Sequence, residues 1–282
     1  MLSILSTQHD LKNYIANKIA AGKTIGFVPT MGALHEGHLT LAREALAEND
    51  ECIVSIFVNP KQFAPHEDFD KYPRTLDKDS ALLEDIGVQS IFAPSVDVMY
   101  PPDFQSSVTV GNISKPLEGE FRPHFFTGVA TVVTRLLLLV GAHKAYFGEK
   151  DYQQLQVIKA LQRDLAIPTE IIGVPTVREA SGLALSSRNA YLSPTQKDQA
   201  LTIIRTLRHM ADELKSGQPI AQIEATATEN LLSAGFDKVD YMTIRDADTL
   251  LPPTPTTKSH RLLAAAWLGQ TRLIDNIGVS SK

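Results

Sequence analysis

The sequence predicts an α/β protein in which a larger N-terminal domain with a parallel β-sheet precedes a smaller α+β domain. Short apolar, β-branched segments alternate with amphipathic segments over the first two-thirds of the chain. This alternation is typical of βαβ units, in which helices connect parallel strands. The apolar segments are continuous rather than alternating, as expected for strands that helices cover on both faces.

The elements of the first domain follow in order along the chain. Its predicted strands are TIGFV, CIVSIFV, SIFAP, KAYF and TEIIGV. Its predicted helices occupy residues 37–49, 75–86, 128–140 and 152–165. In the last of these, Leu155, Ile158 and Leu161 recur at the helical spacing. Together they predict a Rossmann-like parallel sheet over residues 1–176.

The pattern changes after about Val177. Ser193 is a predicted helix cap and Pro194 the first residue of a long helix. A second helix is predicted over residues 220–233. Three strand-like segments follow: KVDYMTIR, RLLAAAWL and TRLIDNI. We therefore predict a smaller α+β lid domain with antiparallel strands over residues 177–282.

Composition limits the partners and the compartment. A formal net charge of −5 and a pI near 5.9 argue against a broad nucleic-acid or membrane surface. The longest apolar block, LLLLV, is far shorter than the roughly 20 residues that span a bilayer. The single cysteine, Cys52, lies within an apolar segment and indicates a buried thiol in a reducing compartment. We predict a soluble cytoplasmic protein.

The stretch PTMGALHEGH, from Pro29 to His38, follows the first predicted strand. Ligands bind at the carboxyl ends of strands in open parallel sheets, so His35 and His38 fall where a site is expected. Their spacing of three residues places both on one helical turn. A helix N-terminus attracts phosphate, and imidazole N–H groups would add donors. Gly32 and Gly37 favour close approach of a ligand to the backbone.

Two other interpretations of these histidines remain open. The zinc-protease helix reads H-E-x-x-H with histidines four residues apart, whereas HEGH has a spacing of three and no clear third ligand nearby. The spacing therefore disfavours a metal site without excluding it. His35 and His38 are also compatible with surface histidines at a helix start.

Several motifs carry a resemblance to a known family. PTMGALHEGH resembles the HIGH-type signature of the nucleotidylyltransferase superfamily. The resemblance continues, in order, through SIFVNPKQF, YPRTLDKD, FGEKDYQQLQVI and REASGLALSSRN. The set covers nearly the whole chain and resembles the pantoate-beta-alanine ligase (pantothenate synthetase) family.

The resemblance implies two half-reactions. ATP and pantoate give an enzyme-bound pantoyl adenylate and pyrophosphate, and β-alanine then attacks the adenylate to give pantothenate and AMP. The first nucleophile is a carboxylate that is ionised near neutral pH, so it needs no general base. Catalysis is then positioning and charge stabilisation at the α-phosphate. The resemblance also implies Mg²⁺ and a homodimer.

The resemblance assigns roles to individual residues. His35 and His38 contact ATP phosphates, Asp151 contacts the ribose, and Arg188 stabilises the departing pyrophosphate in a KMSKS-like loop. The predicted catalytic residues are His35, His38, Lys150, Ser186, Ser187 and Arg188. The predicted ATP-binding residues are Pro29, Thr30, Met31, His35, Gly37, His38, Gly148, Lys150, Asp151, Val177, Leu185, Ser186, Ser187 and Arg188.

A second set concerns the other substrates and the metal. The predicted pantoate and β-alanine contacts are Met31, Asn59, Gln62, Arg122 and Gln154. Asp79 matches a carboxylate associated with Mg²⁺, although Asp77 and Asp79 also fit helix-dipole or capping residues. Segments around 63–72 and 186–189 are candidates for loop closure.

The chain departs from the family pattern at two places. The family usually shows R-P-x-H-F-x-G, but this chain reads RPHFFTG, so Phe125 stands at the histidine position and His124 one residue earlier. Leu185 replaces the methionine of LAMSSRN, a swap of similar size that costs little.

Two alternatives to the ligase remain. One is a sister transferase that stops at a nucleotidylated product, with aminoacyl-tRNA synthetase-like enzymes in the same group; the acidic composition disfavours the tRNA version. The other is a non-catalytic nucleotide sensor. A sensor predicts loss of cations at the phosphates, yet Lys150, Arg188 and both histidines are present.

Overall fold

The computed structural model describes residues 2–63, 69–70 and 72–280, which form two compact units. The first unit holds the residues up to Glu149 together with Gln153–Pro175. The second holds Lys150–Tyr152 together with the residues from Thr176 onward. The sequence pattern did not predict that Lys150–Tyr152 would group with the second unit.

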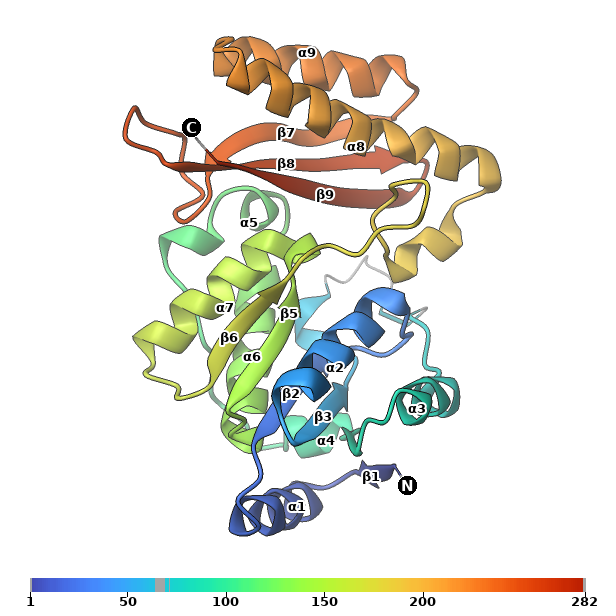
Figure 1. The fold of residues 1–282 in the computed structure, drawn as a ribbon, viewed down its shortest axis with the longest axis vertical. Helices are drawn as coiled ribbons and strands as arrows, with labels where there is room; N and C mark the ends of the chain where they lie inside the picture. The colour runs from blue at the N-terminus through green and yellow to red at the C-terminus, as the bar shows by residue number, and fades with distance from the viewer. Residues whose placement is uncertain (1, 64–68, 71, 281–282) are drawn as a thin grey trace. The chain divides into compact units, whose positions relative to one another are not determined.

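The first unit is built on a six-stranded sheet in the order β1-β4-β3-β2-β5-β6 (Figure 1). Every neighbouring pair is parallel. The strands are β1 (Ser3–Leu5), β2 (Ile25–Thr30), β3 (Glu51–Ile56), β4 (Ser90–Phe92), β5 (Lys144–Gly148) and β6 (Glu170–Val174). The predicted Rossmann-like parallel sheet is therefore confirmed.

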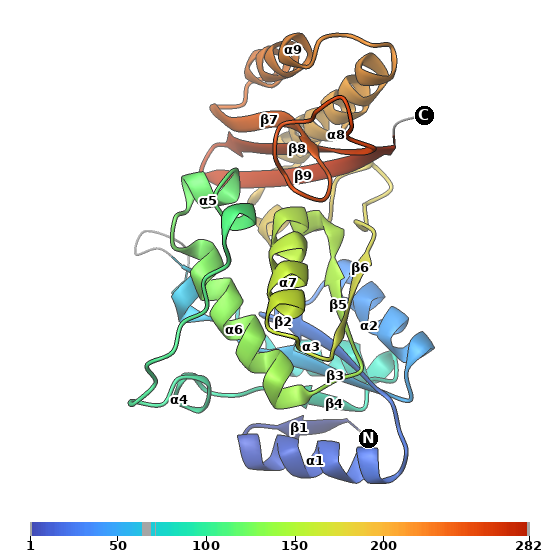
Figure 2. The ribbon, with the colours of Figure 1, turned by 90° about the vertical axis from the view of Figure 1, so that its left-hand side faces the viewer.

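Helices connect these strands and cover both faces of the sheet (Figure 2). They are α1 (Gln8–Ala20), α2 (Glu36–Glu48), α3 (Leu76–Asp85), α4 (Val96–Met99), α5 (Glu118–Phe121), α6 (Phe125–Val140) and α7 (Tyr152–Asp164). Single 3-10 turns are η1 (Pro60–Gln62), η2 (Asn112–Ser114) and η3 (Glu149–Asp151).

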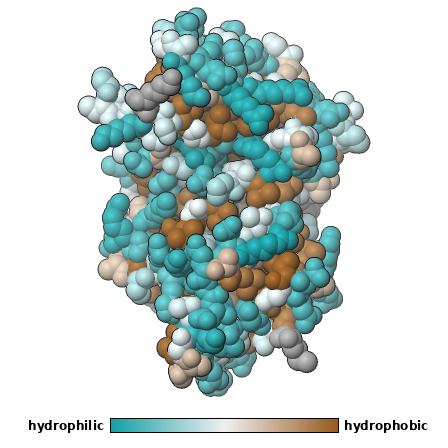
Figure 3. Space-filling model, viewed as in Figure 1, coloured by the Kyte–Doolittle hydropathy of each residue, from teal (hydrophilic) through white to brown (hydrophobic). Residues whose placement is uncertain are grey.

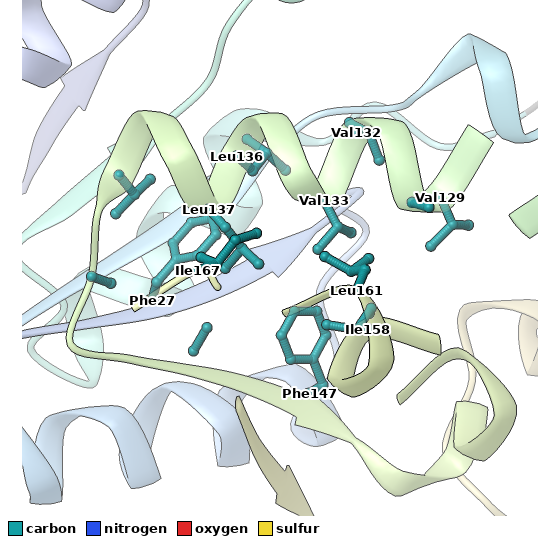
Figure 4. Packing of buried hydrophobic residues seen from close by; sticks show 14 of the residues in the cluster. Phe27, Val129, Val132, Val133, Leu136, Leu137, Phe147, Ile158, Leu161 and Ile167 are labelled. Carbon is teal, nitrogen blue, oxygen red and sulfur yellow. The ribbon is translucent and has the colours of Figure 1, made fainter. Parts of the chain in front are cut away.

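Two apolar cores lie on the two faces of this sheet, and adjacent residues of β2 enter different cores. Phe27 packs in the core that α6 and α7 cover, beside Leu137, and Phe147 belongs to the same core (Figure 4). Val28 packs in the core that α2 covers. Burial of such a side chain stabilises the fold by about 1.5–3 kcal/mol. Apolar residues are needed on both faces of β2, which explains its continuous apolar run.

Cys52 lies in the second of these cores and is 0% exposed. Burial raises the pKa of its thiol to about 12. The prediction of a buried thiol is confirmed.

The second unit has an antiparallel sheet in the order β7-β8-β9 and two helices. Its elements are η4 (Ser187–Tyr191), α8 (Pro194–Lys215), α9 (Ile220–Ser233), β7 (Lys238–Asp246), β8 (Ser259–Leu268) and β9 (Thr271–Ser280). Ser193 and Gln196 form a capping box at the start of α8, with Pro194 at its first position. The predicted α+β composition and this helix start are confirmed.

β1 and α1 were not predicted from the sequence. β1 pairs with β4 at the edge of the sheet, and its three residues are too few for a periodic signal. The Thr7 hydroxyl accepts a hydrogen bond from the backbone N–H of Asp10 and so caps α1. This cap was present in the sequence and could have revealed the helix.

The surface is mixed in polarity. On the face drawn in Figure 3, hydrophilic side chains are interspersed with hydrophobic ones. Within the described part of the chain, none of the helices has the length and apolar character needed to cross a membrane.

Candidate active site

The strand order reverses beside β2. From β2 the chain moves through β3 to β4, and it then returns to β5 on the other side of β2. In open parallel sheets, ligands bind outside the carboxyl ends of the strands at such a switch point. The loop after β2 and the turn after β5 start at this edge, so a ligand site is expected where both sequence motifs lie.

His35 and His38 form the N-terminal cap of α2. The Nδ1 atom of His35 accepts from the backbone N–H of Gly37 at 3.2 Å. The Nδ1 atom of His38 accepts from the backbone N–H of His35 at 3.4 Å, which completes a capping box. The ring centroids are 4.0 Å apart. A neutral ring that accepts at Nδ1 carries its proton at Nε2, so in the neutral form each ring has an Nε2–H donor.

Asp79 fixes the loop between β2 and α2. Asp79 is 1% exposed, and its carboxylate accepts from the backbone N–H groups of Ala33 at 3.0 Å and Leu34 at 2.9 Å. The Thr75 hydroxyl donates to the same carboxylate at 3.1 Å. Ala33 has a φ of 51°, a left-handed conformation that costs energy for a residue other than glycine. Asp79 therefore holds a strained loop directly before His35.

The backbone of the same loop is tied to β3. The Thr30 hydroxyl donates to the carbonyl of Ser55 at 2.7 Å and accepts from the N–H of Gly32 at 3.2 Å. Pro29 and Thr30 are the last residues of β2 and lie beside Ser55 and Ile56 of β3. These contacts fix the point at which the chain leaves the sheet.

Met31, Asn59 and Gln62 lie together after β2 and β3. The Gln62 side-chain amide donates to the Met31 sulfur at 2.8 Å, and Asn59 donates to the Gln62 side-chain oxygen at 3.1 Å. Asn59 is 1% exposed; it also donates to the Gly128 carbonyl at 3.2 Å and accepts from the Tyr100 hydroxyl at 2.8 Å. Asn59 therefore orients Gln62, which in turn contacts Met31.

Arg122 joins this group from the turn before α6. It donates to the Gln62 backbone carbonyl at 3.3 Å and lies 3.9 Å from the Glu118 carboxylate. Its guanidinium carbon stands 3.8 Å from the centre of the Phe125 ring, a cation–π contact. Phe125 thus supports Arg122, and it is one of the residues at which the sequence departs from the pattern that it resembles. His124 stands at the start of α6 and makes no side-chain cap.

The turn after β5 is divided between the two units. Gly148 ends β5, and among the described residues no heavy atom would lie within 4 Å of a Cβ added there, so this position is open. Gln154 lies on α7 in the first unit. Lys150 and Asp151 belong to the second unit, where the Asn276 side chain donates to the Lys150 carbonyl at 2.8 Å.

In the second unit, residues 177–185 form a small hairpin. The N–H of Leu185 donates to the carbonyl of Val177 at 3.0 Å. Ser186 follows and accepts from the N–H of Arg188 at 3.2 Å, which begins the turn η4 at Ser187. The Asn189 side chain donates to the Ala184 carbonyl at 3.0 Å and fixes the end of the loop.

The structure thus links some predicted residues directly and leaves others in separate groups. Met31, Asn59, Gln62 and Arg122 form one connected group, and the two histidines form another. Lys150, Asp151, Val177 and the residues from Leu185 to Arg188 lie in the second unit. Of the loop predicted over 63–72, residues 64–68 and 71 lie outside the described residues.

The residues that could hold a metal are few. In the described parts of the chain, no group of three or more His, Cys, Asp or Glu side chains could hold a metal ion. Asp79 already accepts from two backbone N–H groups and a hydroxyl. The association of Asp79 with Mg²⁺ stays a prediction.

Two residues of this site were missed from sequence. Tyr100 is buried and orients Asn59, and Glu118 lies beside Arg122. Tyr100 stands 41 residues from Asn59, and no local pattern marks this pairing. Glu118 lies four residues before Arg122, the spacing of neighbours on a helix, but no helix was predicted over this segment.

The fold and these groups define a Rossmann-like α/β protein with a paired-histidine helix start at the switch point of its sheet. Residues 3–278 match the family model described as pantoate-beta-alanine ligase, and the chain belongs to this family.

Named relatives are similar over nearly the full chain. A pantothenate synthetase from Caulobacter vibrioides is 50% identical over 279 residues, which is 98% of each chain. One from Moorella thermoacetica is 48% identical over 277 residues, again 98% of each.

Solved structures agree with this assignment. A crystal structure of pantothenate synthetase from Thermus thermophilus superposes with a TM-score of 0.92 at 44% identity, covering 98% of each chain. A pantoate-beta-alanine ligase from Francisella tularensis, complexed with beta-gamma ATP and β-alanine, gives 0.83 at 37% identity and covers 98% of this chain and 97% of that one. The family resemblance noted in the sequence is therefore confirmed.

Proposed function

We propose that this chain catalyses the ATP-dependent condensation of pantoate with β-alanine to pantothenate through an enzyme-bound pantoyl adenylate. Family membership over residues 3–278 supports the activity. The main support for the proposal is that the paired histidines and the Gln62 group follow neighbouring strands. The paired histidines follow β2 and the Gln62 group follows β3, and these strands are parallel neighbours. An ATP phosphate and a pantoate would therefore meet at one edge of the sheet.

In the proposed first step, the pantoate carboxylate attacks the α-phosphorus of ATP. A carboxyl oxygen–phosphorus bond forms, the bond to the bridging oxygen breaks, and pyrophosphate leaves. His35 and His38 donate from Nε2–H to phosphate oxygens, and the N-terminus of α2 adds partial positive charge. Lys150 and Arg188 stabilise the pyrophosphate, with Ser186 and Ser187 as hydroxyl donors.

The Gln62 group is the proposed pantoate site. The Gln62 amide and the Arg122 guanidinium supply hydrogen-bond donors for a hydroxy acid, and Met31 supplies an apolar surface. Asn59 contributes by orienting Gln62, since its own polar atoms are paired within the group. Gln154 is a further proposed contact.

In the proposed second step, the amine of β-alanine attacks the acyl carbon of the adenylate. A carbon–nitrogen bond forms, the attacking nitrogen loses a proton, and AMP leaves with the electrons of the broken acyl–oxygen bond. The amine must be neutral to attack, so its ammonium form loses a proton before this step. Binding of β-alanine by the Francisella tularensis relative supports an amine site in this family.

Mg²⁺ would arrive with ATP and neutralise phosphate charge. Asp79 is the predicted carboxylate for it. Because that carboxylate already accepts three hydrogen bonds, a direct ligand does not fit well, and the proposed steps do not depend on one.

Pyrophosphate release from ATP tests this proposal. Release that requires pantoate, followed by AMP and amide formation only when β-alanine is added, is the expected result. Release that ignores pantoate would contradict the ligase and favour a transferase of another substrate. Amide formation without AMP would exclude the adenylate.

Two lysines give a matched pair of variants for the same assay. Lys150→Gln removes the proposed phosphate cation and is expected to lower pyrophosphate release by about 100-fold. Lys159→Gln changes an exposed lysine on α7 and should leave release unchanged. Equal rates in the two variants would remove Lys150 from the site.

Assembly, compartment and domain roles are also part of the proposal. We infer a homodimer in the cytoplasm, in which residues 1–176 bind ATP and pantoate and residues 177–282 form a smaller lid. The buried, protonated Cys52 is compatible with a reducing compartment. Sedimentation equilibrium should give twice the 30.9 kDa chain mass, and a monomer mass would refute the dimer.

A further inference from the structure

Asp275 and Asn276 are adjacent buried polar residues on β9, with 6% and 3% of their surface exposed. Successive side chains of a strand point to opposite faces, so the two reach different segments. All contacts described below lie within the second unit.

Asp275 holds Arg178 with two parallel hydrogen bonds. Arg178 donates from Nη1 to one carboxylate oxygen at 2.7 Å and from Nη2 to the other at 2.8 Å. The same guanidinium donates to the carbonyls of Gly182 at 3.1 Å and Asn276 at 3.3 Å. A planar bidentate pair of this kind fixes direction as well as distance.

Arg178 lies on the first arm of the hairpin that leads into the Ser186–Arg188 loop. Arg178 bridges to Ala184 across the hairpin, and the N–H of Glu179 donates to Leu183 at 2.8 Å. Ala184 in turn accepts from the side chain of Asn189, beyond the loop. The Asp275 carboxylate therefore fixes the base of the segment that carries Arg188.

Asn276 holds the other cationic segment. Its amide donates to the Lys150 carbonyl at 2.8 Å, and its oxygen accepts from Arg261 at 2.6 Å. The Arg261 guanidinium lies 3.9 Å from the centre of the Tyr152 ring. Asn276 of β9 thus holds the backbone at Lys150, and Arg261 of β8 contacts the side chain of Tyr152.

We propose that Asp275 and Asn276 are positioning residues that hold Lys150 and the Ser186–Arg188 loop in fixed places for the phosphates of ATP. The inference rests on the function proposed above. A preorganised pair of cations needs no rearrangement when charge develops, and a misplacement of about 1 Å can lower a rate by about 100-fold. Neither residue touches substrate; each acts through the segment that it holds.

Asp240 provides a matched control in the same sheet. It is a buried carboxylate, 1% exposed at its side chain, that accepts from Arg272 at 2.7 Å and from Trp267 at 3.1 Å. These partners lie in β8 and β9 rather than in either cationic segment. Asp240→Asn should therefore lower stability as Asp275→Asn does, but without displacing a cation.

The test compares Asp275→Asn, Asn276→Ala and Asp240→Asn in the full chain. For Asp275→Asn and Asn276→Ala, we expect kcat of pantoate-dependent pyrophosphate release to fall about 10- to 100-fold with KM for pantoate nearly unchanged, because the cations act on developing charge. Asp240→Asn should keep the wild-type kcat per folded molecule. Equal kcat in all three variants would show that Asp275 and Asn276 only stabilise the fold.

Amide hydrogen exchange gives a second readout that does not depend on catalysis. Asn276→Ala should accelerate exchange at residues 150–152, and Asp275→Asn should accelerate it at residues 182–189, each more than at β7. Uniform acceleration throughout the unit would overturn the inference. If Asp275→Asn does not fold, Asp275→Glu keeps the charge but displaces it by one methylene, and its kcat is expected to fall in the same way.

The two proposals fail in different ways. A wild-type chain without pantoate-dependent release would refute the proposed function and this inference with it. An active wild type whose Asp275 and Asn276 variants keep full kcat would refute only the positioning role.

Discussion

The Nδ1 atom of His38 accepts a hydrogen bond from the backbone N–H of His35, three residues earlier, at 3.4 Å. This bond satisfies one of the N–H groups that a helix start leaves unpaired. It also fixes the ring orientation and places the ring proton of the neutral form at Nε2. One residue thus stabilises α2 and presents a donor at its positive end.

His38→Ala is expected to reduce pantoate-dependent pyrophosphate release by about 100-fold or more, because it removes a donor to the phosphates. It also removes a helix cap that contributes about 1 kcal/mol, which corresponds to a fall in Tm of about 2–4 °C. Stopped-flow release and thermal unfolding measure the two effects.

His38→Glu separates these effects. A glutamate at the third helical position is the usual acceptor of a capping box, so it should restore the Tm. An ionised carboxylate has no proton to donate to a phosphate oxygen, so pyrophosphate release should stay slow. A wild-type rate of pyrophosphate release in both variants would show that His38 is only a surface histidine at a helix start.

Gly128 allows α6 to pack directly on η1. A Cβ at this position would lie 2.1 Å from the Lys61 carbonyl oxygen and 2.9 Å from the Gln62 Cα. Gly128→Ala should therefore displace Gln62, raise KM for pantoate about tenfold and lower the Tm, although alanine favours the helix by about 1 kcal/mol. Steady-state kinetics with varied pantoate measures the first effect.

Gly111→Ala is the control for this substitution. Among the described residues no heavy atom would lie within 4 Å of a Cβ added at Gly111, so this change does not displace Gln62. Its KM for pantoate should match the wild type. A higher Tm and an unchanged KM in Gly128→Ala would mean that helix propensity outweighs the clash.

The features that were predicted correctly from the sequence are those that depend on residues close together along the chain. The position of His35 and His38 on one turn, the Ser193 cap and the continuous apolar strands all follow from periodicity or spacing, and the structure has each of them. The order of the strands, which puts the switch point of the sheet between β2 and β5, was not predicted because the pairing of β2 with β5 joins residues more than a hundred positions apart.

The parts of the site that the sequence did not predict are tertiary contacts. Asn59 was predicted to contact pantoate, yet its orientation comes from Tyr100 and Gly128, which lie 41 and 69 residues away. Asp275 meets Arg178 at a separation of 97 residues. A single sequence carries no signal for such pairs, and the family resemblance assigned roles without showing what holds each side chain.

Asp79→Asn tests how the loop before His35 is held. The variant keeps one acceptor oxygen, so one of the two buried N–H groups of Ala33 and Leu34 is left unpaired, at a cost of about 1–3 kcal/mol. We expect a lower Tm and slower pyrophosphate release at every Mg²⁺ concentration. Asp77→Asn, an exposed change in the first turn of α3, should alter neither.

A Mg²⁺ titration distinguishes the two roles of Asp79. Full recovery of Asp79→Asn at high Mg²⁺ would contradict a role in fixing the loop and would support the predicted association with the metal. A rate that stays low at saturating Mg²⁺ would support the contacts with Ala33 and Leu34.

Protonation of Asp240 at acid pH is expected to lower the stability of the second unit. Burial acts to raise the pKa of Asp240, but hydrogen bonds from Lys238, Arg272 and Trp267 outweigh it, so the pKa lies below its ordinary value of 3.8. A carboxyl with a lowered pKa in the folded state stabilises that state above the unfolded pKa and loses this effect as the pH falls through the folded value. At neutral pH, Asp240→Asn should therefore have a lower Tm than the wild type. The difference should shrink below about pH 4, where the unfolded wild type takes up a proton more readily than the folded form. Thermal unfolding of both proteins from pH 7 to pH 3 measures it, and a difference that stays constant over this range would show that the charge of Asp240 does not contribute.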